Sequence, residues 1–224
     1  MTAYFVTATG TDIGKTFVTA GLIRHLREAG KRVDALKPVV SGFDLATAAI
    51  SDPGVLLEAL GVPITPESLD RISPWRFAAP LSPDMAAARE SRSVPYDEIV
   101  SLCREAVATH QGTLFIEGVG GVMVPLDDHT VLDWMAALDL PAIVVAGTYL
   151  GTISHTLTAL DVLKRANVTV AALVLNDTGD GGVPLAETRA TLARLAPHVP
   201  IAEIPRVKGF VAARAEFARL AALL

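Results

Sequence analysis

The N-terminal segment constrains the fold of this sequence more than any other stretch. Residues Tyr4 to Ala8 are apolar and partly β-branched, which predicts a buried strand. A run compatible with a helix follows from Lys15 to Ala29, and the turn between them ends in Gly14-Lys15-Thr16. This order of strand, glycine-bearing turn and helix is typical of a phosphate-binding loop. In such a loop, backbone N–H groups surround the phosphates, the lysine neutralises their charge and the hydroxyl reaches a metal ion.

The loop departs from the standard pattern GxxxxGK(S/T) at its first glycine, where this sequence has Thr9. We expect the next residue, Gly10, to supply the backbone freedom instead. The alternative is an ordinary strand–turn–helix with a surface lysine. The place of the motif directly after a strand and at the start of a helix favours the phosphate site.

Composition limits the class of protein. A chain of 224 residues, 51% of them hydrophobic, suits a single α/β domain spanning residues 1–224. A net charge of -5 and no basic stripe argue against a nucleic-acid surface. The single cysteine, Cys103, rules out an intramolecular disulfide and is expected to be a core residue in a reducing compartment.

A membrane or secretory role is not expected. The stretch from Leu140 to Leu160 has no charged residue, but it contains Pro141, two glycines and several threonines, which are costly in lipid. No signal peptide is visible at the N-terminus. We therefore expect a cytoplasmic protein without membrane contact.

Strands and helices are predicted to alternate along the chain. The expected strands after the first are Lys31–Leu36, Thr113–Ile116, Ala142–Ala146, Thr169–Leu175 and Ile201–Ile204. The expected helices after the first are Pro53–Leu60 with Asp52 as its N-cap, Tyr96–His110, Thr130–Leu138, Ser154–Ala166 (or from Thr152), Pro184–Ala196 and Val211–Leu223. Residues 37–42 are expected to form a loop, and the proline-rich residues 62–95 short helices and loops. Continuously apolar strands in this order, together with the phosphate-binding loop, predict a P-loop NTPase-like α/β three-layer sandwich with a mostly parallel sheet.

Polar residues are expected to gather where the strands end, because parallel sheets bind ligands at their carboxyl ends. Glu117 ends one strand and is a candidate magnesium ligand, although a solvated acid is the alternative. Lys37 ends another strand, expected to be central and near the phosphate loop. It could neutralise charge in phosphoryl transfer, or it could be a surface lysine.

Two further strand-end or helix-start residues remain ambiguous from the sequence. Asp52 stands before Pro53 as a helix N-cap, which explains it fully, but a carboxylate there could also bind metal, with Asp44 as a rival. Asn176 could offer its carboxamide to a base, or be a turn residue. No Lys follows it as in the guanine-binding Asn-Lys-x-Asp segment, so adenine is favoured over guanine.

Taken together, these segments resemble the dethiobiotin synthetase family. The resemblance covers almost the whole chain and depends on the order and spacing of its motifs. These are Tyr4-Phe5-Val6-Thr7 with Gly14-Lys15-Thr16, Lys37-Pro38-Val39-Val40-Ser41-Gly42, Ser51-Asp52, Ser82-Pro83, Glu117-Gly118-Val119-Gly120-Gly121, Leu150-Gly151-Thr152-Ile153-Ser154-His155, Asn176-Asp177 and Glu203-Ile204-Pro205. The sequence departs from the family at Ala8, often glycine, Asp84, commonly histidine, Ser154, commonly asparagine, and Ala212, a glutamate in some members.

The resemblance implies a role for particular residues. Lys37 and Lys15 would be catalytic, and Thr16, Asp52 and Glu117 would hold Mg²⁺. Thr11 and Ser41 would hold the carbamylated substrate, and Gly151, Thr152, Ile153 and Ser154 the substrate carboxylate from the neighbouring subunit of a homodimer. ATP would contact Asp12, Ile13, Gly14, Lys15, Thr16, Phe17, Asp52, Glu117, Gly118, Val119, Gly120, Asn176, Asp177, Pro205, Arg206 and Val207.

The implied reaction joins 7,8-diaminopelargonic acid and carbon dioxide into dethiobiotin with ATP. Two other classes share parts of the pattern. Partitioning ATPases typically have a second lysine five residues before the loop lysine, where this sequence has Gly10. Cobyrinate-type amidoligases have an added glutaminase domain, for which 224 residues leave no room.

Overall fold

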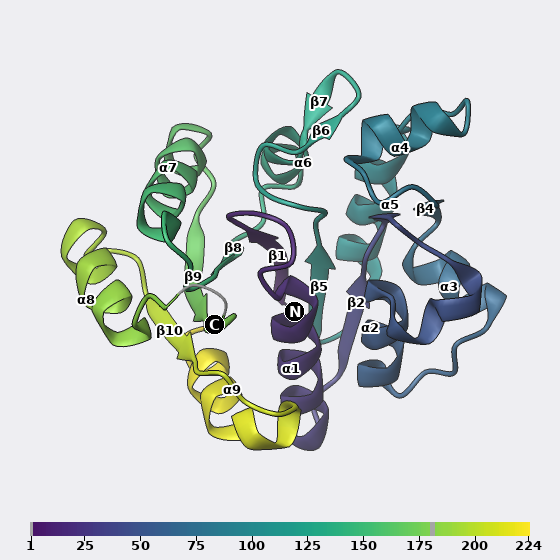
Figure 1. Cartoon of the computed structure of the whole chain (residues 1–224). Helices are drawn as coiled ribbons and strands as arrows, with labels where there is room; N and C mark the ends of the chain where they lie inside the picture. Colours follow the sequence, from purple (N-terminus) through teal and green to yellow (C-terminus); the bar gives the residue numbers. More distant parts are fainter. Residues whose placement is uncertain (1, 180–181) are drawn as a thin grey trace.

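Parallel strands form the centre of the molecule (Figure 1). The computed structural model describes residues 2–179 and 182–224. Within these residues, six parallel strands pair in the order β10-β9-β8-β1-β5-β2. They are β1 (Thr2–Ala8), β2 (Val33–Leu36), β5 (Thr113–Glu117), β8 (Ala142–Ala146), β9 (Val170–Asn176) and β10 (Ile201–Ile204). The predicted parallel sheet is confirmed, but β2 lies at its edge and not at its centre.

Helices cover both faces of this sheet. The helices are α1 (Lys15–Glu28), α2 (Asp52–Leu60), α3 (Pro66–Ile72), α4 (Pro83–Arg89), α5 (Tyr96–Thr109), α6 (Val131–Leu138), α7 (Thr152–Arg165), α8 (Leu185–Leu195) and α9 (Arg214–Ala221). One core lies between the sheet and α1, α2, α3 and α9, and the other between the sheet and α4 to α8. Figure 1 shows α1 in front of the strands. The predicted three-layer architecture is therefore confirmed.

The alternation of side chains along β1 explains why there are two cores. Tyr4 and Val6 belong to the core beneath α1, whereas Ala3 and Phe5 belong to the opposite one. Phe5 packs edge-on against Trp134 of α6, with ring centroids 4.9 Å apart. A strand buried on both faces is expected to be apolar along most of its length, as β1 is from Ala3 to Val6.

Several short elements were not expected from the sequence. Residues 37–42 are not all loop, because β3 (Val39–Ser41) pairs there with β4 (Trp75–Phe77) from the proline-rich region. The hairpin of β6 (Pro125–Leu126) and β7 (His129–Thr130) and the 3-10 helices η1 (Leu45–Ile50) and η2 (Phe210–Ala213) were also missed. The last α-helix begins at Arg214 because η2 occupies the residues before it. Such segments are too short to show periodicity.

Two expectations from composition can be compared with the structure. Cys103 is buried in the core as expected, and burial raises the pKa of its thiol to about 12. Its thiol is therefore protonated and unreactive at neutral pH. Among the helices that the structure describes, none combines the length and the hydropathy needed to cross a bilayer.

The contact between α1 and α9 depends on a glycine inside a helix. Gly21 lies in the buried face of α1, and a Cβ built there would overlap the ring of Phe217 in α9. Glycine costs about 1 kcal/mol relative to alanine inside a helix. Here the missing side chain allows the aromatic ring to approach the helix backbone.

We predict that Gly21→Ala lowers the free energy of unfolding by at least about 1 kcal/mol, in spite of alanine's higher helix propensity. Phe217→Ala removes the ring and should cost about 3–5 kcal/mol by itself. In that background, Gly21→Ala should be neutral or stabilising. Urea unfolding of the two single variants and the double variant measures the coupling. Equal effects of Gly21→Ala in both backgrounds would show that the overlap does not matter.

Candidate functional site

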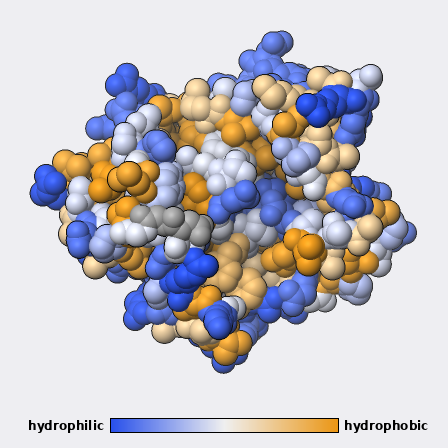
Figure 2. Space-filling model, viewed as in Figure 1, coloured by the Kyte–Doolittle hydropathy of each residue, from blue (hydrophilic) through white to orange (hydrophobic). Residues whose placement is uncertain are grey.

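A cavity of about 420 Å³ opens at the carboxyl ends of the strands. In Figure 2, residues coloured white to blue lie near the middle of this face of the molecule, with hydrophobic residues around them. Many of the predicted site residues line the cavity, and they come from four separate segments of the chain. The predicted residues that line it are Thr11, Asp12, Gly14, Lys15, Thr16, Lys37, Ser41, Asp52, Val119 and Gly120.

The turn between β1 and α1 forms one wall of this cavity. Gly14 is the N-cap of α1 with φ of 97°, and Asp12 has φ of 58°, so both lie in the left-handed region. Gly10 does not, which corrects the expectation that it supplies the unusual backbone angle. Lys15 folds back over the turn, and its Nζ donates to the carbonyl of Gly10 at 3.3 Å. The turn thus has a lysine above it and the free N–H groups of a helix start below.

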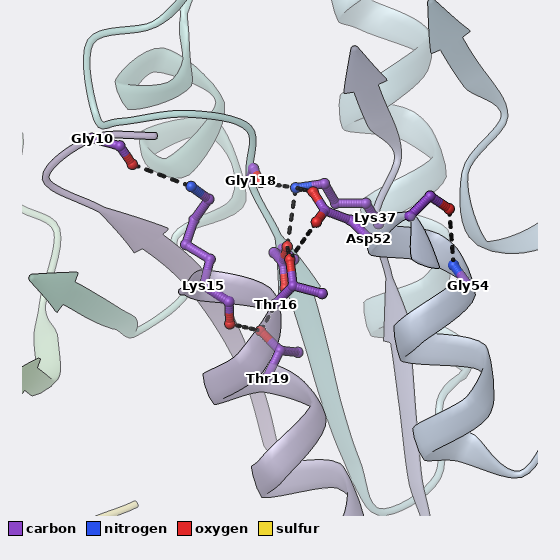
Figure 3. A network of polar contacts seen from close by, with 10 residues as sticks. Gly10, Lys15, Thr16, Thr19, Lys37, Asp52, Gly54 and Gly118 are labelled. Carbon is purple, nitrogen blue, oxygen red and sulfur yellow. Dashed lines mark hydrogen bonds and ion pairs between the residues drawn. The ribbon is translucent and has the colours of Figure 1, made fainter. Parts of the chain in front are cut away.

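Oxygen atoms from three elements meet beside this turn (Figure 3). The Thr16 hydroxyl lies 2.8 Å from Asp52 Oδ1 and 2.7 Å from Glu117 Oε1. A hydroxyl has one proton, so it can donate to only one of these two carboxylates at a time. The arrangement therefore brings together more acceptors than protons, which suits a cation.

Lys37 supplies positive charge to the same group. Its Nζ lies 3.0 Å from Asp52 Oδ2 and 3.0 Å from Glu117 Oε1, and it donates to the carbonyl of Gly118 at 2.7 Å. Lys37 is 1% exposed and Glu117 is fully buried. Burial lowers the pKa of Lys37, but the charges and hydrogen bonds of Glu117 and Asp52 outweigh it and raise the pKa overall. Lys37 is thus a charged, buried residue although β2 lies at the edge of the sheet.

The pKa values of Lys15 and Asp52 are shifted by burial and by the charges of this cluster. Burial, and then the positive charge of Lys37, lower the pKa of Lys15 to about 8. Partial burial would raise the pKa of Asp52, but Lys37 and the Thr16 hydroxyl outweigh it and hold the pKa below its usual value. Asp52 is therefore ionised at neutral pH. An anion bound beside Lys15 would favour the charged form of Lys15.

Asp52 is not the helix cap that the sequence predicted. Ser51 is the N-cap of α2, and its hydroxyl accepts from the N–H of Gly54 at 3.4 Å. This leaves the Asp52 carboxylate, one residue later, for the contacts with Thr16 and Lys37. The rival residue, Asp44, caps η1 by accepting from Ala46 N at 2.9 Å and does not line the cavity.

The predicted base-binding residues lie on the other side of the turn. Asn176 Nδ2 donates to the carbonyl of Ile13 at 2.8 Å. Asp177 Oδ1 accepts from Thr148 Oγ1 and from Gly179 N, both at 2.9 Å, and so connects the loops after β8 and β9. Arg206 contacts the carbonyl of Thr178.

Two other predicted residues point away from the cavity. Phe17 stacks on Phe210 with centroids 4.8 Å apart. Ile13 is buried beneath the turn.

The predicted adenine-binding segment Pro205 to Val207 follows β10. Pro205 and Arg206 are exposed, and Val207 is partly buried.

The start of α7, predicted from the resemblance to bind a carboxylate, is not part of this cavity. Gly151 is its N-cap with φ of 101°, and no side chain caps the helix. Thr152 instead donates its hydroxyl to the carbonyl of Gly147 at 2.6 Å, and Ser154 is exposed. The alternative in which Thr152 or Ser154 caps the helix is therefore wrong. The N–H of Thr152 donates to the carbonyl of Tyr149 at 3.0 Å, and the next two N–H groups of α7, those of Ile153 and Ser154, can face an anion.

Comparison with known proteins identifies the family. A family model described as an AAA domain matches residues 2–214. A relative named ATP-dependent dethiobiotin synthetase from Acidiphilium cryptum is 49% identical over 87% of this chain and 88% of its own length. A second with the same name, from Methylobacterium nodulans, is 46% identical over 95% of this chain and 96% of its own length. The chain belongs to the dethiobiotin synthetase family. This confirms the resemblance seen in the sequence.

Solved structures add evidence for the fold alone. The MinC:MinD cell division protein complex of Aquifex aeolicus matches with a TM-score of 0.59 over 99% of this chain and 96% of that chain, at 10% identity. A ParA family ATPase of Chlorobium tepidum matches with a TM-score of 0.55 over 100% and 91%, at 14% identity. The P-loop NTPase fold predicted for this member of the dethiobiotin synthetase family is confirmed.

Sequence reasoning missed several residues around the cavity of this dethiobiotin synthetase family member. Val40, Gly42, Ile50 and Ser51 also line it. More important, Thr19 is buried one helical turn after Lys15, and its hydroxyl lies 2.7 Å from Glu117 Oε2 and 3.0 Å from the carbonyl of Lys15. Its spacing places it on the same helix face as Lys15, which could have indicated it.

We predict that Thr19→Val destabilises the protein through Glu117. Thr188 is a matched control, because it is similarly buried in α8 and its hydroxyl donates, among the described residues, only to the carbonyl of Pro184, at 3.0 Å. A hydrogen bond to a charged group is worth about 1.5–3 kcal/mol, more than a neutral one. Thr19→Val should therefore lower the free energy of unfolding by at least about 1 kcal/mol more than Thr188→Val. Equal losses in urea unfolding would show that the Glu117 contact has no energetic weight.

Proposed function

We propose that this chain, residues 1–224 as a single domain, converts 7,8-diaminopelargonic acid, carbon dioxide and ATP into dethiobiotin, ADP and phosphate with Mg²⁺. The observation that supports this most is Lys37, a buried cation lining the same cavity as the phosphate-binding turn. Identity of 44–49% to several relatives named ATP-dependent dethiobiotin synthetase supports the substrate assignment.

The ATP phosphates bind at the turn from Asp12 to Phe17 and at Gly118 to Gly120, of which Val119 and Gly120 line the cavity. The free N–H groups at the start of α1 donate to the phosphate oxygens, and Lys15 and Lys37 neutralise their charge. Asn176 and the backbone of Pro205 to Val207 hold adenine, with Asp177 shaping the neighbouring loop. This residue set favours ATP over GTP.

Thr16, Asp52 and Glu117 would hold Mg²⁺. Their oxygens are the hard ligands that this ion prefers, and one hydroxyl proton between two carboxylate oxygens fits a place for a cation. In the described parts of the chain no cluster of three or more His, Cys, Asp or Glu residues is suited to a metal. Mg²⁺ typically takes one or two carboxylates and completes its shell with water and phosphate, so two suffice. When bound, the ion would neutralise charge on the phosphate oxygens.

The reaction needs positioning and charge neutralisation, and no covalent bond to the protein. One amine of the substrate adds carbon dioxide to give a carbamate, held by Thr11 and Ser41. A carbamate oxygen attacks the γ-phosphorus of ATP and ADP leaves. The second amine then attacks the carbamate carbon, closes the ring and expels phosphate. Lys37 and Lys15 stabilise the negative charge that develops on the transferred group.

A direct assay tests the proposal. Protein incubated with ATP, Mg²⁺, bicarbonate and the diamine should form dethiobiotin, detected by mass spectrometry, and omission of any one component should abolish it. ATP hydrolysis without this product would favour a partitioning ATPase. Product formation on a cobyrinate-type acid with glutamine would favour an amidoligase. Either outcome would overturn the assignment, as would preference for GTP.

We predict that Lys37→Ala lowers kcat by about 10²–10³-fold, because it removes a preorganised positive charge from the reacting group. The dissociation constant for ATP should change only a few-fold, since the backbone of the turn and Lys15 remain. Lys31→Ala, an exposed lysine before β2, is the matched control and should behave as wild type. Steady-state kinetics and calorimetry measure the two effects, and near-normal turnover of Lys37→Ala would contradict the catalytic role.

The substrate carboxylate is proposed to bind at Gly151 to Ser154 of a second subunit, so that each active site of a homodimer uses both chains. The uncapped start of α7 favours an anion. Leu150, the residue before it, is 89% exposed, as an apolar residue at an interface would be in a single chain.

We predict that Ser154→Glu raises the KM for the diamine about tenfold or more, because it places a like charge beside the carboxylate, while the KM for ATP stays within about twofold. Thr158→Glu adds the same charge one turn later on α7, also on the surface, and should change the KM for the diamine less. Kinetics and light scattering test both parts. An active monomer, or an unchanged KM for the diamine in Ser154→Glu, would contradict the shared site.

A further inference from the structure

The side chain of Asn176 contacts the phosphate-binding turn directly. Its Nδ2 lies 2.8 Å from the carbonyl oxygen of Ile13, a residue 163 positions earlier in the chain. A carbonyl oxygen can only accept, so the nitrogen of the carboxamide must face it. The end of β9 is thereby linked to the middle of the turn that follows β1.

The turn is shaped to receive this carboxamide. Gly14 follows Ile13 with φ of 97°, and a Cβ built on it would overlap Asn176 Nδ2. The carboxamide therefore packs against the backbone at a point where only glycine leaves room. On the other side, the buried Ile13 side chain lies beside Gly147 and Gly10. The peptide between Ile13 and Gly14 is held from both directions.

Holding this carbonyl also sets the direction of an N–H group. The Ile13–Gly14 peptide is trans, so its N–H points opposite to its C=O. The carbonyl points toward Asn176, and the N–H of Gly14 therefore points away from Asn176. Gly14 lines the cavity, so the contact fixes the orientation of one potential phosphate donor before any ligand binds.

We propose that Asn176 is a positioning residue for the phosphate-binding turn, in addition to any contact it makes with the base. The proposal builds on the proposed function, because it concerns the same nucleotide site. One amide hydrogen bond to the turn leaves the carboxamide oxygen to accept from an amino group of the base. A single side chain then connects the base end of the nucleotide site with the turn that holds the phosphates.

The first test uses the nucleotide-free protein. The N–H of Val18 donates to the carbonyl of Gly14 at 3.0 Å, so its hydrogen exchange reports on the order of the turn. In Asn176→Ala and Asn176→Asp, exchange at Val18 should accelerate about tenfold, as expected for the loss of a hydrogen bond worth about 1.4 kcal/mol. Gln111→Ala removes an exposed carboxamide before β5, at the opposite end of the sheet, and should change nothing there. Exchange at Val18 equal to wild type in both Asn176 variants would overturn the proposal.

The second test separates the turn from the base by using inorganic tripolyphosphate, which has no base. Calorimetry should show about tenfold weaker tripolyphosphate binding in both Asn176 variants and wild-type binding in Gln111→Ala. Weaker ADP binding with unchanged tripolyphosphate binding would show that Asn176 contacts only the base, and would overturn the proposal. If the wild-type protein binds neither ligand, the proposed nucleotide site itself fails, and the exchange measurement still decides the role of Asn176 in the turn.

Discussion

The ion pair between Lys37 and Glu117 is the interaction on which the geometry of the cavity depends. Both groups are almost completely removed from water, which costs several kcal/mol per ion unless the charges are paired and hydrogen-bonded. Lys37 and Glu117, at the ends of two neighbouring strands, pair with each other. Two hydroxyls of α1 contact Glu117, and Asp52, the first residue of α2, contacts Lys37. None of these elements can move independently without leaving a buried charge unpaired, so the charges fix the distances between them.

The turn that we propose to bind the phosphates contains a lysine whose charged form is disfavoured, and an anion would relieve this. Lys15 and Lys37 line one cavity, and the positive charge of Lys37 contributes to the lowered pKa of Lys15. The two carboxylates, which contact Thr16 at the start of α1, act in the opposite direction and raise the pKa of Lys15, but less than burial and Lys37 lower it. A phosphate placed between the lysines would interact favourably with both, and its binding would favour the protonated form of Lys15. The charge of Lys37, which together with burial disfavours the protonated form of Lys15, would thus favour a phosphate in the cavity.

The sequence was sufficient for the architecture and for the residues at the strand ends. Apolar runs such as residues 142–146 are typical of strands buried on both faces, and parallel strands place their ends together. The errors came from choices between neighbouring residues that sequence alone could not decide. Ser51 and Asp52 are both good caps, and only the packing of α2 shows that the serine has this role. Because Thr9 replaces the usual glycine, the neighbouring Gly10 was predicted to supply the unusual backbone angle. The residues with left-handed angles in this turn are Asp12 and Gly14.

Other features depend on contacts between distant residues and leave no local pattern. The hydroxyl of Thr19 matters because Glu117 lies opposite it, 98 positions later. The same is true of Asn176 and Ile13. A three-residue strand such as β3 has too few positions for an alternation to appear, and it exists because β4 lies beside it. The edge position of β2 likewise follows from the pairing order and not from its composition.

The edge position of β2 has a consequence for folding. This strand has four residues and a neighbour on one side only, and Leu36 is paired with Ile116 of β5. The next residues along are Lys37 and Glu117, so the correct alignment is the one that brings the two charges together. A slip by one residue would turn the side chains of β2 to the opposite face and bury a lysine and a glutamate apart. The charges that form the cavity therefore also exclude misaligned pairing of this edge strand.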